Sequence, residues 1–240
     1  MSELEKLFKK AKKGDAESQH LIAFNYWAGE DFPVDYSQAM KWWKLSAKKG
    51  FGKAYFNLAM MYLNGDGVPV NLKASYKYHN LSIKKKHKYQ SISYYLLAKK
   101  FYLDGLLKKK DINKGLKYME IAGKKGDFSA TYQLGIIYDS KFDIYDEYGI
   151  KKDDKKAFKF YKDAADKKFI PALQQVITMY SNGQGVKKSY KMIIKYINLI
   201  KENDNDDLIN NTTLLPEAKK SIKAMIKKMK KKYDKVLNEI

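Results

Sequence analysis

The chain has 240 residues, and its content of 45% hydrophobic and 14% aromatic residues is ample for a core packed with rings. Its formal net charge of +21 comes from 48 lysines against 27 acidic residues, and the lack of arginine argues against sequence-specific nucleic-acid recognition, because reading base edges depends mostly on guanidinium groups. The lack of cysteine excludes disulfides and thiolate metal sites and fits a reducing compartment.

Two explanations of the charge stay open. An AT-rich genome favours the codons of lysine, isoleucine, asparagine and tyrosine, and this explanation, which needs no ligand, is the preferred one. The alternative is an anionic partner, such as an acidic protein, a membrane surface or nucleic acid bound without sequence preference.

We predict a helix over residues 1–13 that caps one end of the fold. Ser2 and Glu5 have capping-box spacing ahead of the apolar residues Leu4, Leu7 and Phe8. The amino terminus has no apolar run of signal-peptide length, and lysines interrupt the apolar runs elsewhere too early for a bilayer span. We therefore expect a cytoplasmic protein without a transmembrane segment, with signal-independent secretion as an open alternative.

From residue 14 onward the sequence repeats. A tyrosine ends an apolar run of helical period five times, at intervals of 36, 40, 36 and 42 residues: Tyr26, Tyr62, Tyr102, Tyr138 and Tyr180. A second helical run then begins at Ala39, Ala74, Gly115, Ala157 and Met192. Each unit is predicted to be two antiparallel helices joined by a turn, and such a hairpin needs a neighbour to bury its apolar face.

The predicted fold is all-α, a right-handed α-solenoid superhelix of about five helix-turn-helix repeats with capping helices at both ends, in a single domain over residues 1–240. The repeats span residues 14–50, 51–86, 87–126, 127–168 and 169–201. Helices are expected at 16–28 and 36–49, 52–64 and 72–86, 91–103 and 112–125, and 171–182 and 189–201. In the third repeat Lys99 stands where Ala59 and Gly135 are small, which predicts looser packing there.

The fourth repeat carries an insertion between residues 139 and 149. It mixes aromatic and acidic residues, and Phe142, Tyr145 and Tyr148 are its candidate binding residues. A partner-binding loop and a tolerated surface loop are both consistent with this pattern.

The composition changes after residue 201. Residues 202–215 form an acidic connector, and Pro216 opens a predicted basic helix, residues 216–240, with an apolar stripe and a lysine-rich opposite face. Capping the exposed end of the solenoid is its preferred role, and docking on a membrane or in an acidic groove is the alternative.

The stretch from Ala54 to Ser82 resembles a Sel1-like repeat, a solenoid family related to tetratricopeptide repeats. The residues that carry the resemblance are Ala54, Leu58, Ala59, Met61, Tyr62, Asn64, Gly65, Asp66, Gly67, Val68, Ala74 and Tyr78. Similar units cover residues 14–201. The resemblance implies that the first helices of the repeats line a concave groove that binds a protein or peptide.

Transferring groove positions from repeat to repeat gives thirteen candidate partner-binding residues: His20, Phe24, Trp27, Asn57, Met60, Asn64, Lys100, Asp104, Gln133, Ile136, Asp139, Gln175 and Thr178. Asparagine and glutamine there would bond an extended backbone, and the large apolar side chains would hold partner side chains. For each single residue, an exposed helix face without a ligand is the alternative.

The sequence lacks the patterns of catalysis. The histidines His20, His79 and His87 lie on different elements without metal-ligand spacing, and no phosphate-binding glycine loop or nucleophile motif occurs. We therefore expect no enzyme and no cofactor, but an adaptor or regulator with a protein partner, expected to be acidic. An immunity or inhibitor protein or a secreted effector is a variant of this hypothesis, and lysine-mediated binding to anionic membrane or nucleic acid is the alternative of another class.

Overall fold

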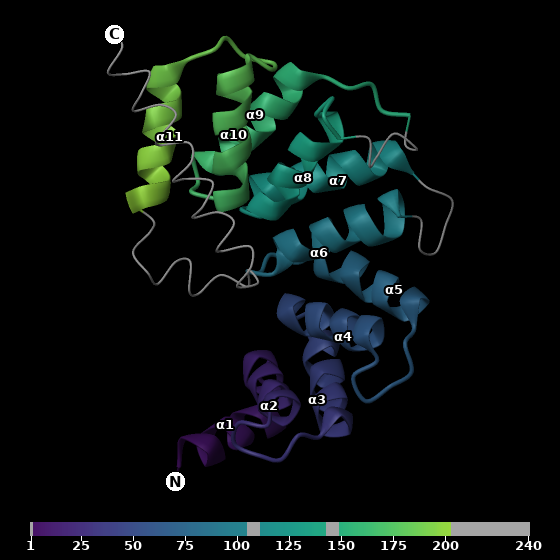
Figure 1. Cartoon of the computed structure of the whole chain (residues 1–240). Helices are drawn as coiled ribbons and strands as arrows, with labels where there is room; N and C mark the ends of the chain where they lie inside the picture. The colour runs from purple at the N-terminus through teal and green to yellow at the C-terminus, as the bar shows by residue number, and fades with distance from the viewer. Residues whose placement is uncertain (1, 105–110, 143–148, 203–240) are drawn as a thin grey trace. The chain divides into compact units, whose positions relative to one another are not determined.

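The computed structural model describes residues 2–104, 111–142 and 149–202, and every regular element in these ranges is a helix (Figure 1). The elements in chain order are α1 (Glu3–Lys12), α2 (Ala16–Ala28), α3 (Tyr36–Lys48), α4 (Gly52–Asn64), α5 (Leu72–Ser82), α6 (Gln90–Leu96), η1 (Leu97–Leu103), α7 (Ile112–Lys124), α8 (Phe128–Tyr138), α9 (Asp154–Ala165), α10 (Ile170–Asn182) and α11 (Tyr190–Glu202). The predicted all-α array of paired helices is confirmed.

The chain divides into two compact units, unit 1 (Met1–Ala130) and unit 2 (Thr131–Ile240). Most predicted helices agree with the structure to within one residue. The main exception is α5, which ends at Ser82 and not at residue 86, so that a longer connection leads to the third repeat. The predicted acidic connector beyond Glu202 and the basic helix 216–240 lie outside the described residues.

One polar residue closes each of the first four hairpins. Asp35, Asn71, Asp111 and Asp153 are the N-caps of α3, α5, α7 and α9, and each side chain accepts a hydrogen bond from a backbone N–H three residues on, at 2.9–3.0 Å. The backbone N–H of the same residue donates to the carbonyl of the repeated tyrosine, over 2.8–3.0 Å. One residue thus starts the second helix and ties it to the end of the first.

The amino-terminal helix α1 covers α2 as predicted. Both hydrogen bonds of the capping box between Ser2 and Glu5 are present. The Gln19 side chain of α2 donates to the Ala11 carbonyl over 3.0 Å, and Phe8 packs edge-on against Trp42, with ring centroids 6.1 Å apart. Through these contacts α1 covers the outer side of the first hairpin, which has no preceding repeat to pack against.

The core of the first two repeats combines small residues with rings. Ala23, Ala39, Ala47 and Ala54 are buried around Trp43, with Leu58 and Met61 beside them. Alanine at these places lets helix axes approach, and the indole fills the space between them. The sequence pattern of small and aromatic residues is thus the packing pattern of the core.

The segment η1 is a π-helix, and it contains Lys99. A π-helix accommodates an extra residue within a helix. Ala98, which is fully buried, takes the small-residue position, and its carbonyl lies 3.4 Å from where a Cβ of Gly115 would stand. The expectation of looser packing at Lys99 is therefore wrong, because the register shifts by one residue and Lys99 stays partly exposed.

A buried polar cluster joins the second and third repeats. Hydrogen bonds link His79 Nδ1 to Ser93 Oγ (3.3 Å), Ser93 Oγ to Ser82 Oγ (2.9 Å), and Ser82 Oγ to His87 Nε2 (2.9 Å). Burial lowers the pKa of His79 to about 3 and also lowers the pKa of His87. Both imidazoles are therefore neutral at pH 7.

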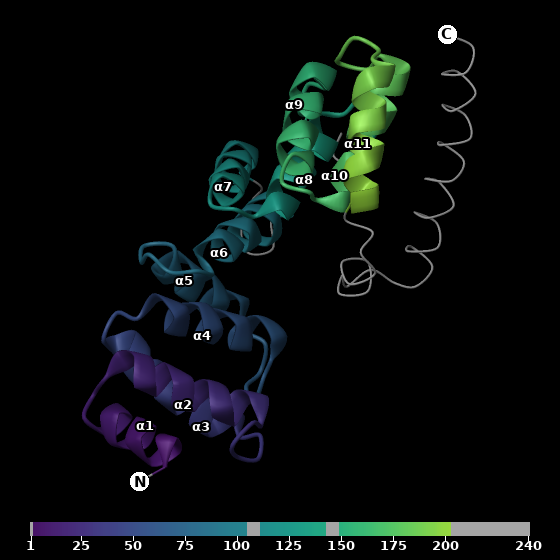
Figure 2. The same cartoon turned by 90° about the vertical axis from the view of Figure 1, so that its left-hand side faces the viewer.

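In unit 2, α10 packs between α9 and α11, and Figures 1 and 2 show the three helices side by side. Tyr161 of α9 lies so close to Gly135 of α8 that a Cβ on Gly135 would stand 2.4 Å from its ring. The hydroxyl of Tyr196 on α11 donates to Asp166, at the end of α9, over 2.9 Å. Close backbone approach and buried rings therefore stabilise this unit as they do unit 1.

Candidate partner-binding site

Unit 1 contains a cavity of about 360 Å³ whose walls come mainly from α2 and α4, the first helices of the first two repeats. Its lining residues are Phe24, Trp27, Trp43, Phe56, Asn57, Met60, Met61, Asn64, Asp66 and Tyr89. Five of the predicted groove residues, Phe24, Trp27, Asn57, Met60 and Asn64, are therefore brought together by the fold. We call this feature the aromatic cavity.

Helical spacing explains why these five side chains meet. Asn57, Met60 and Asn64 follow one another at steps of three and four along α4, so they share one face of that helix. Phe24 and Trp27 are three apart on α2 and share a face in the same way. Hairpin stacking then sets these two faces against one another across the cavity.

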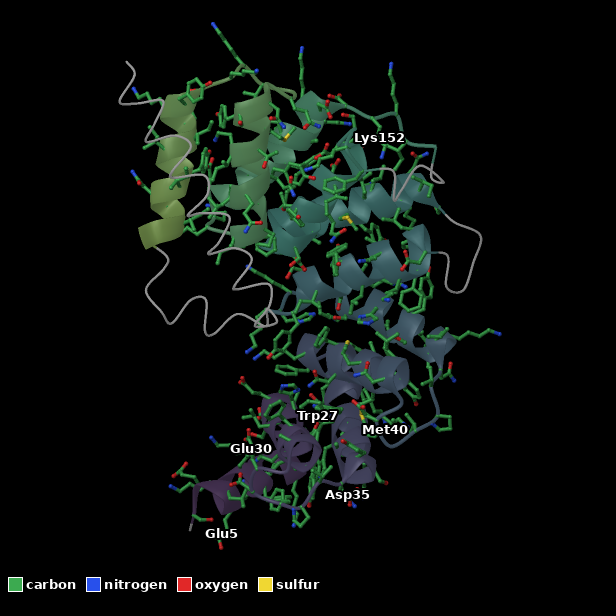
Figure 3. All side chains as sticks on the ribbon, in the orientation of Figure 1. Glu5, Trp27, Glu30, Asp35, Met40 and Lys152 are labelled. Carbon is green, nitrogen blue, oxygen red and sulfur yellow. The ribbon has the colours of Figure 1, made fainter. Side chains whose placement is uncertain are left out.

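Aromatic rings form the walls of the cavity. The rings of Phe24 and Trp27 lie 5.8 Å apart between centroids, and those of Phe56 and Tyr89 are stacked at 5.0 Å. Trp27, labelled in Figure 3, donates its indole N–H to Asp66 Oδ2 over 3.2 Å. Phe24 and Trp27 keep 36% and 37% of their surface exposed, so both rings are available to a partner.

Polar groups without partners stand among these rings. Within the part of the chain that the structure describes, the side-chain amides of Asn57 and Asn64 make no hydrogen bond. Asn64 is exposed and Asn57 is half-buried. Each amide offers both a donor and an acceptor, which is what an extended peptide backbone requires.

His20 lies behind the cavity wall and does not face the groove. It is 7% exposed, and its Nδ1 accepts a hydrogen bond from Trp43 Nε1 over 3.2 Å. Burial, with smaller effects from the charges of Lys53 and Lys88, lowers its pKa to about 4. The prediction that His20 contacts a partner directly is therefore wrong, and the neutral ring instead orients Trp43.

Asp139 is also buried, contrary to its predicted place in the groove. Its carboxylate accepts hydrogen bonds from the Gln184 side chain (2.7 Å), the Lys141 backbone (2.9 Å) and the Tyr161 hydroxyl (3.2 Å). Gln184 also donates to Asp154 over 3.0 Å. Gln184 thus links Asp139, at the start of the insertion, to Asp154, the first residue of α9, so the role of Asp139 is structural.

The other predicted residues do not line the aromatic cavity. Lys100 and Asp104 are exposed at η1, while Gln133, Ile136, Gln175 and Thr178 are half-buried on α8 and α10. Thr178 donates its hydroxyl to the Gln174 carbonyl over 3.0 Å. Their part in binding stays a prediction.

The insertion is described only at its edges. Phe142 is half-buried, with the Lys141 ammonium 5.7 Å from its ring centroid, and its carbonyl accepts a hydrogen bond from Lys152. Tyr145 and Tyr148 lie outside the described residues. Whether the insertion binds a partner stays a prediction.

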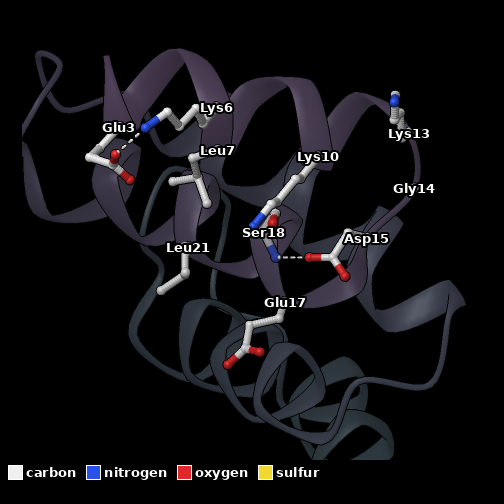
Figure 4. Close-up of a pocket in the computed structure, with 10 residues that line it drawn as sticks. All are labelled: Glu3, Lys6, Leu7, Lys10, Lys13, Gly14, Asp15, Glu17, Ser18 and Leu21. Carbon is white, nitrogen blue, oxygen red and sulfur yellow. Dashed lines mark hydrogen bonds and ion pairs between the residues drawn. The ribbon is translucent and has the colours of Figure 1, made fainter. Parts of the chain in front are cut away.

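A larger cavity, of about 750 Å³, lies between α1 and the start of α2 (Figure 4). Figure 4 shows Leu7 and Leu21 between charged side chains of both signs. Lys6 pairs with Glu3 at 2.6 Å, and Asp15 accepts from the Ser18 backbone at 2.8 Å. Because Leu7 and Leu21 are its only large apolar lining residues, this cavity offers a partner less apolar surface and is a poorer candidate than the aromatic cavity.

The sequence prediction missed the other five residues of the aromatic cavity. They are Trp43, Phe56, Met61, Asp66 and Tyr89. Trp43 and Met61 are almost fully buried, so most of their surface lies in the core and only a small part faces the cavity. Asp66 lies between Gly65 and Gly67, and a polar side chain at such a turn beside the groove is a signal that the sequence does contain.

The described residues show neither a metal site nor a membrane span. No group of three or more histidine or acidic side chains within them could hold a metal ion. None of the described helices combines the length and apolar character that crossing a bilayer requires.

Five segments of the chain match the family model of the Sel1 repeat, at residues 16–51, 52–87, 91–127, 129–169 and 178–192. A search of curated protein sequences gives no match.

Solved structures with this architecture are also similar. The protective antigen c5321 of uropathogenic Escherichia coli, described as displaying an SLR fold, has a TM-score of 0.72 at 24% identity, over 88% of this chain and 44% of that one. A Sel1 repeat protein from Oxalobacter formigenes has a TM-score of 0.64 at 22% identity, over 88% and 84%. The chain thus spans less than half of c5321, and at these identities the likeness establishes the fold alone.

Proposed function

The chain belongs to the Sel1 repeat family, and from this premise we propose that it is a non-catalytic binding protein that holds a segment of a partner protein in the aromatic cavity. The observation that carries the proposal is the combination of exposed rings and free amides at one place. Phe24 and Trp27 are exposed there, and Asn57 and Asn64 have no hydrogen-bonding partner among the described residues.

The cavity favours an extended segment with one bulky apolar side chain. A volume of about 360 Å³ with walls of rings and methionine suits a single large side chain. The amides of Asn57 and Asn64, seven residues apart on α4, would bond the backbone on either side of it.

The biological role of the chain depends on which protein it binds. An adaptor or regulator is the role we favour, since a repeat array presents surface for binding. An immunity protein, an inhibitor or a secreted effector would use the same cavity in the same way. The net charge of +21 favours a partner that is acidic around the bound segment.

Selection of peptides from a random library against the full chain tests this proposal. We expect selected peptides to share a large apolar residue, and Asn57→Ala with Met60→Ala to weaken their binding at least tenfold in calorimetry. Asn64→Ala should weaken binding as well, and Asn113→Ala is its matched control, because both asparagines are exposed on helices of unit 1. Peptides that bind equally well to the cavity and control variants would refute the proposal.

A further inference from the structure

The inter-repeat turns of unit 1 carry lysines at equivalent places. In the turns after α1, α3, α5 and α7, a backbone N–H bonds to the carbonyl three residues back, donated by Gly14, Gly50, Lys85 and Gly126. The residue directly before each donor is lysine: Lys13, Lys49, Lys84 and Lys125. Since lysine makes up one residue in five, composition alone would not fill this place every time.

Three of these turns lie in direct contact, so their lysines form a row. The Cε of Lys49 lies 3.9 Å from where a Cβ of Gly14 would stand, in the preceding turn. Likewise, the Nζ of Lys85 lies 3.5 Å from where a Cβ of Gly50 would stand. We call Lys12, Lys13, Lys48, Lys49, Lys84, Lys85 and Lys86 the lysine ladder.

The ladder is charged and has no counter-ions within the described chain. All seven lysines are exposed, and none makes an ion pair with a described residue. Residues 12–15, 48–53 and 84–89 contain nine lysines and one acidic residue, Asp15, whose carboxylate is bonded to the Ser18 backbone. A single lysine at the carboxyl end of each helix would complement the helix dipole. The two lysines at residues 12–13, the two at 48–49 and the three at 84–86 are therefore more than the dipoles require.

We propose that the lysine ladder binds the phosphate backbone of single-stranded nucleic acid without sequence preference, a function beyond the peptide binding proposed for the aromatic cavity. Lysine ammonium groups neutralise phosphates as point charges. The chain has no arginine, whose guanidinium group is the usual means of recognising base edges, so binding without sequence preference is expected. A flexible strand can follow a single row of charges across successive turns. A membrane fits less well, because the large exposed apolar side chains of the described chain lie outside these turns.

Fluorescence anisotropy with the full chain and a labelled oligothymidylate of about 20 nucleotides tests the ladder. The affinity should fall steeply with salt, with a log–log slope of about −0.7 per phosphate neutralised. The triple variant Lys13→Gln, Lys49→Gln, Lys85→Gln should weaken binding at least tenfold and make the slope shallower by about 2. Circular dichroism melting confirms that the variants are folded.

The control is Lys41→Gln, Lys44→Gln, Lys77→Gln, which removes the same charge from exposed helix positions of unit 1. It should change the affinity less than twofold. Equal losses of oligonucleotide affinity in the two triple variants would overturn the proposal, since net charge alone would then explain binding. Binding to inorganic polyphosphate or anionic vesicles in place of the oligonucleotide would overturn it too, whereas Asn57→Ala with Met60→Ala should leave oligonucleotide binding unchanged.

Discussion

Trp27 Nε1 donates a hydrogen bond to Asp66 Oδ2 over 3.2 Å, and this bond joins the first repeat to the turn of the second. Both residues line the aromatic cavity. The bond holds an exposed indole in one orientation, so the cavity wall is set before a partner arrives.

Asp66→Ala tests this pre-organisation. The pair is solvent-accessible, so the free energy of unfolding should fall by less than about 1.5 kcal/mol. Peptide affinity should fall several-fold, because binding must then also order Trp27. Urea unfolding and calorimetry measure the two effects, and Asp66→Asn, which keeps an acceptor oxygen, should retain most of the affinity. A loss of stability without a loss of affinity would show that the bond is purely structural.

Asn71→Ala tests the residue that closes the second hairpin. The side chain of Asn71 caps α5 by accepting from the Ala74 N–H at 2.9 Å, while its backbone bond to Tyr62 survives the change. The loss should therefore be about 1 kcal/mol in urea unfolding. Asn71→Asp keeps the cap and should lie within about 0.5 kcal/mol of the original chain. Equal losses in the two variants would contradict the capping role.

Lys168→Gly should stabilise the chain. Lys168 has a φ of 63°, a left-handed conformation that the corresponding turns at Gly14, Gly50 and Gly126 assign to glycine. Glycine relieves about 1–2 kcal/mol of strain and loses part of that gain to its greater freedom in the unfolded chain, so the net gain should be about 0.5–1 kcal/mol. Lys167→Gly, whose residue lacks a positive φ, should not stabilise. Destabilisation by Lys168→Gly in thermal unfolding would contradict this account.

Acid should destabilise unit 1 through its buried histidines. Burial lowers the pKa of His79 to about 3 and of His20 to about 4, from the ordinary value of 6.5. At a pH between the ordinary pKa and the folded-state pKa, each histidine binds a proton in the unfolded chain but not in the folded chain. The stabilising contribution of the two histidines is therefore complete above about pH 6.5 and is lost as the pH falls toward their folded-state pKa values.

Urea unfolding at pH 7, 6 and 5 measures this loss. Each histidine should add a slope approaching about 1.4 kcal/mol per pH unit within that window. His79→Gln should lower stability at pH 7 but give a shallower dependence on pH. An unchanged slope in His79→Gln would contradict the neutral, buried state of His79.

The sequence predicted those features that depend on local pattern. Ser2 and Glu5 predicted a capping box, and the helical period of the apolar residues predicted the helix at residues 52–64. These predictions succeeded because capping and helical period act within a few residues.

The errors arose where distant contacts decide the outcome. His20 and Asp139 occupy groove positions in the repeat pattern, but Trp43 and Gln184 draw their side chains into the interior. The register shift at Lys99 depends on how η1 packs, and no single residue type signals it. Tyr89 joins the aromatic cavity only because the long connection after α5 places it beside Phe56.

The most direct test of the central claim is a methyl NMR titration of the full chain, labelled at methionine, with a selected peptide. Met60 and Met61 line the aromatic cavity, whereas Met119 is buried in α7 and serves as the internal reference. We predict that the Met60 methyl signal shifts in proportion to the bound fraction while the Met119 signal stays in place. A saturating peptide that leaves the Met60 signal unmoved would contradict the claim that this cavity holds the partner.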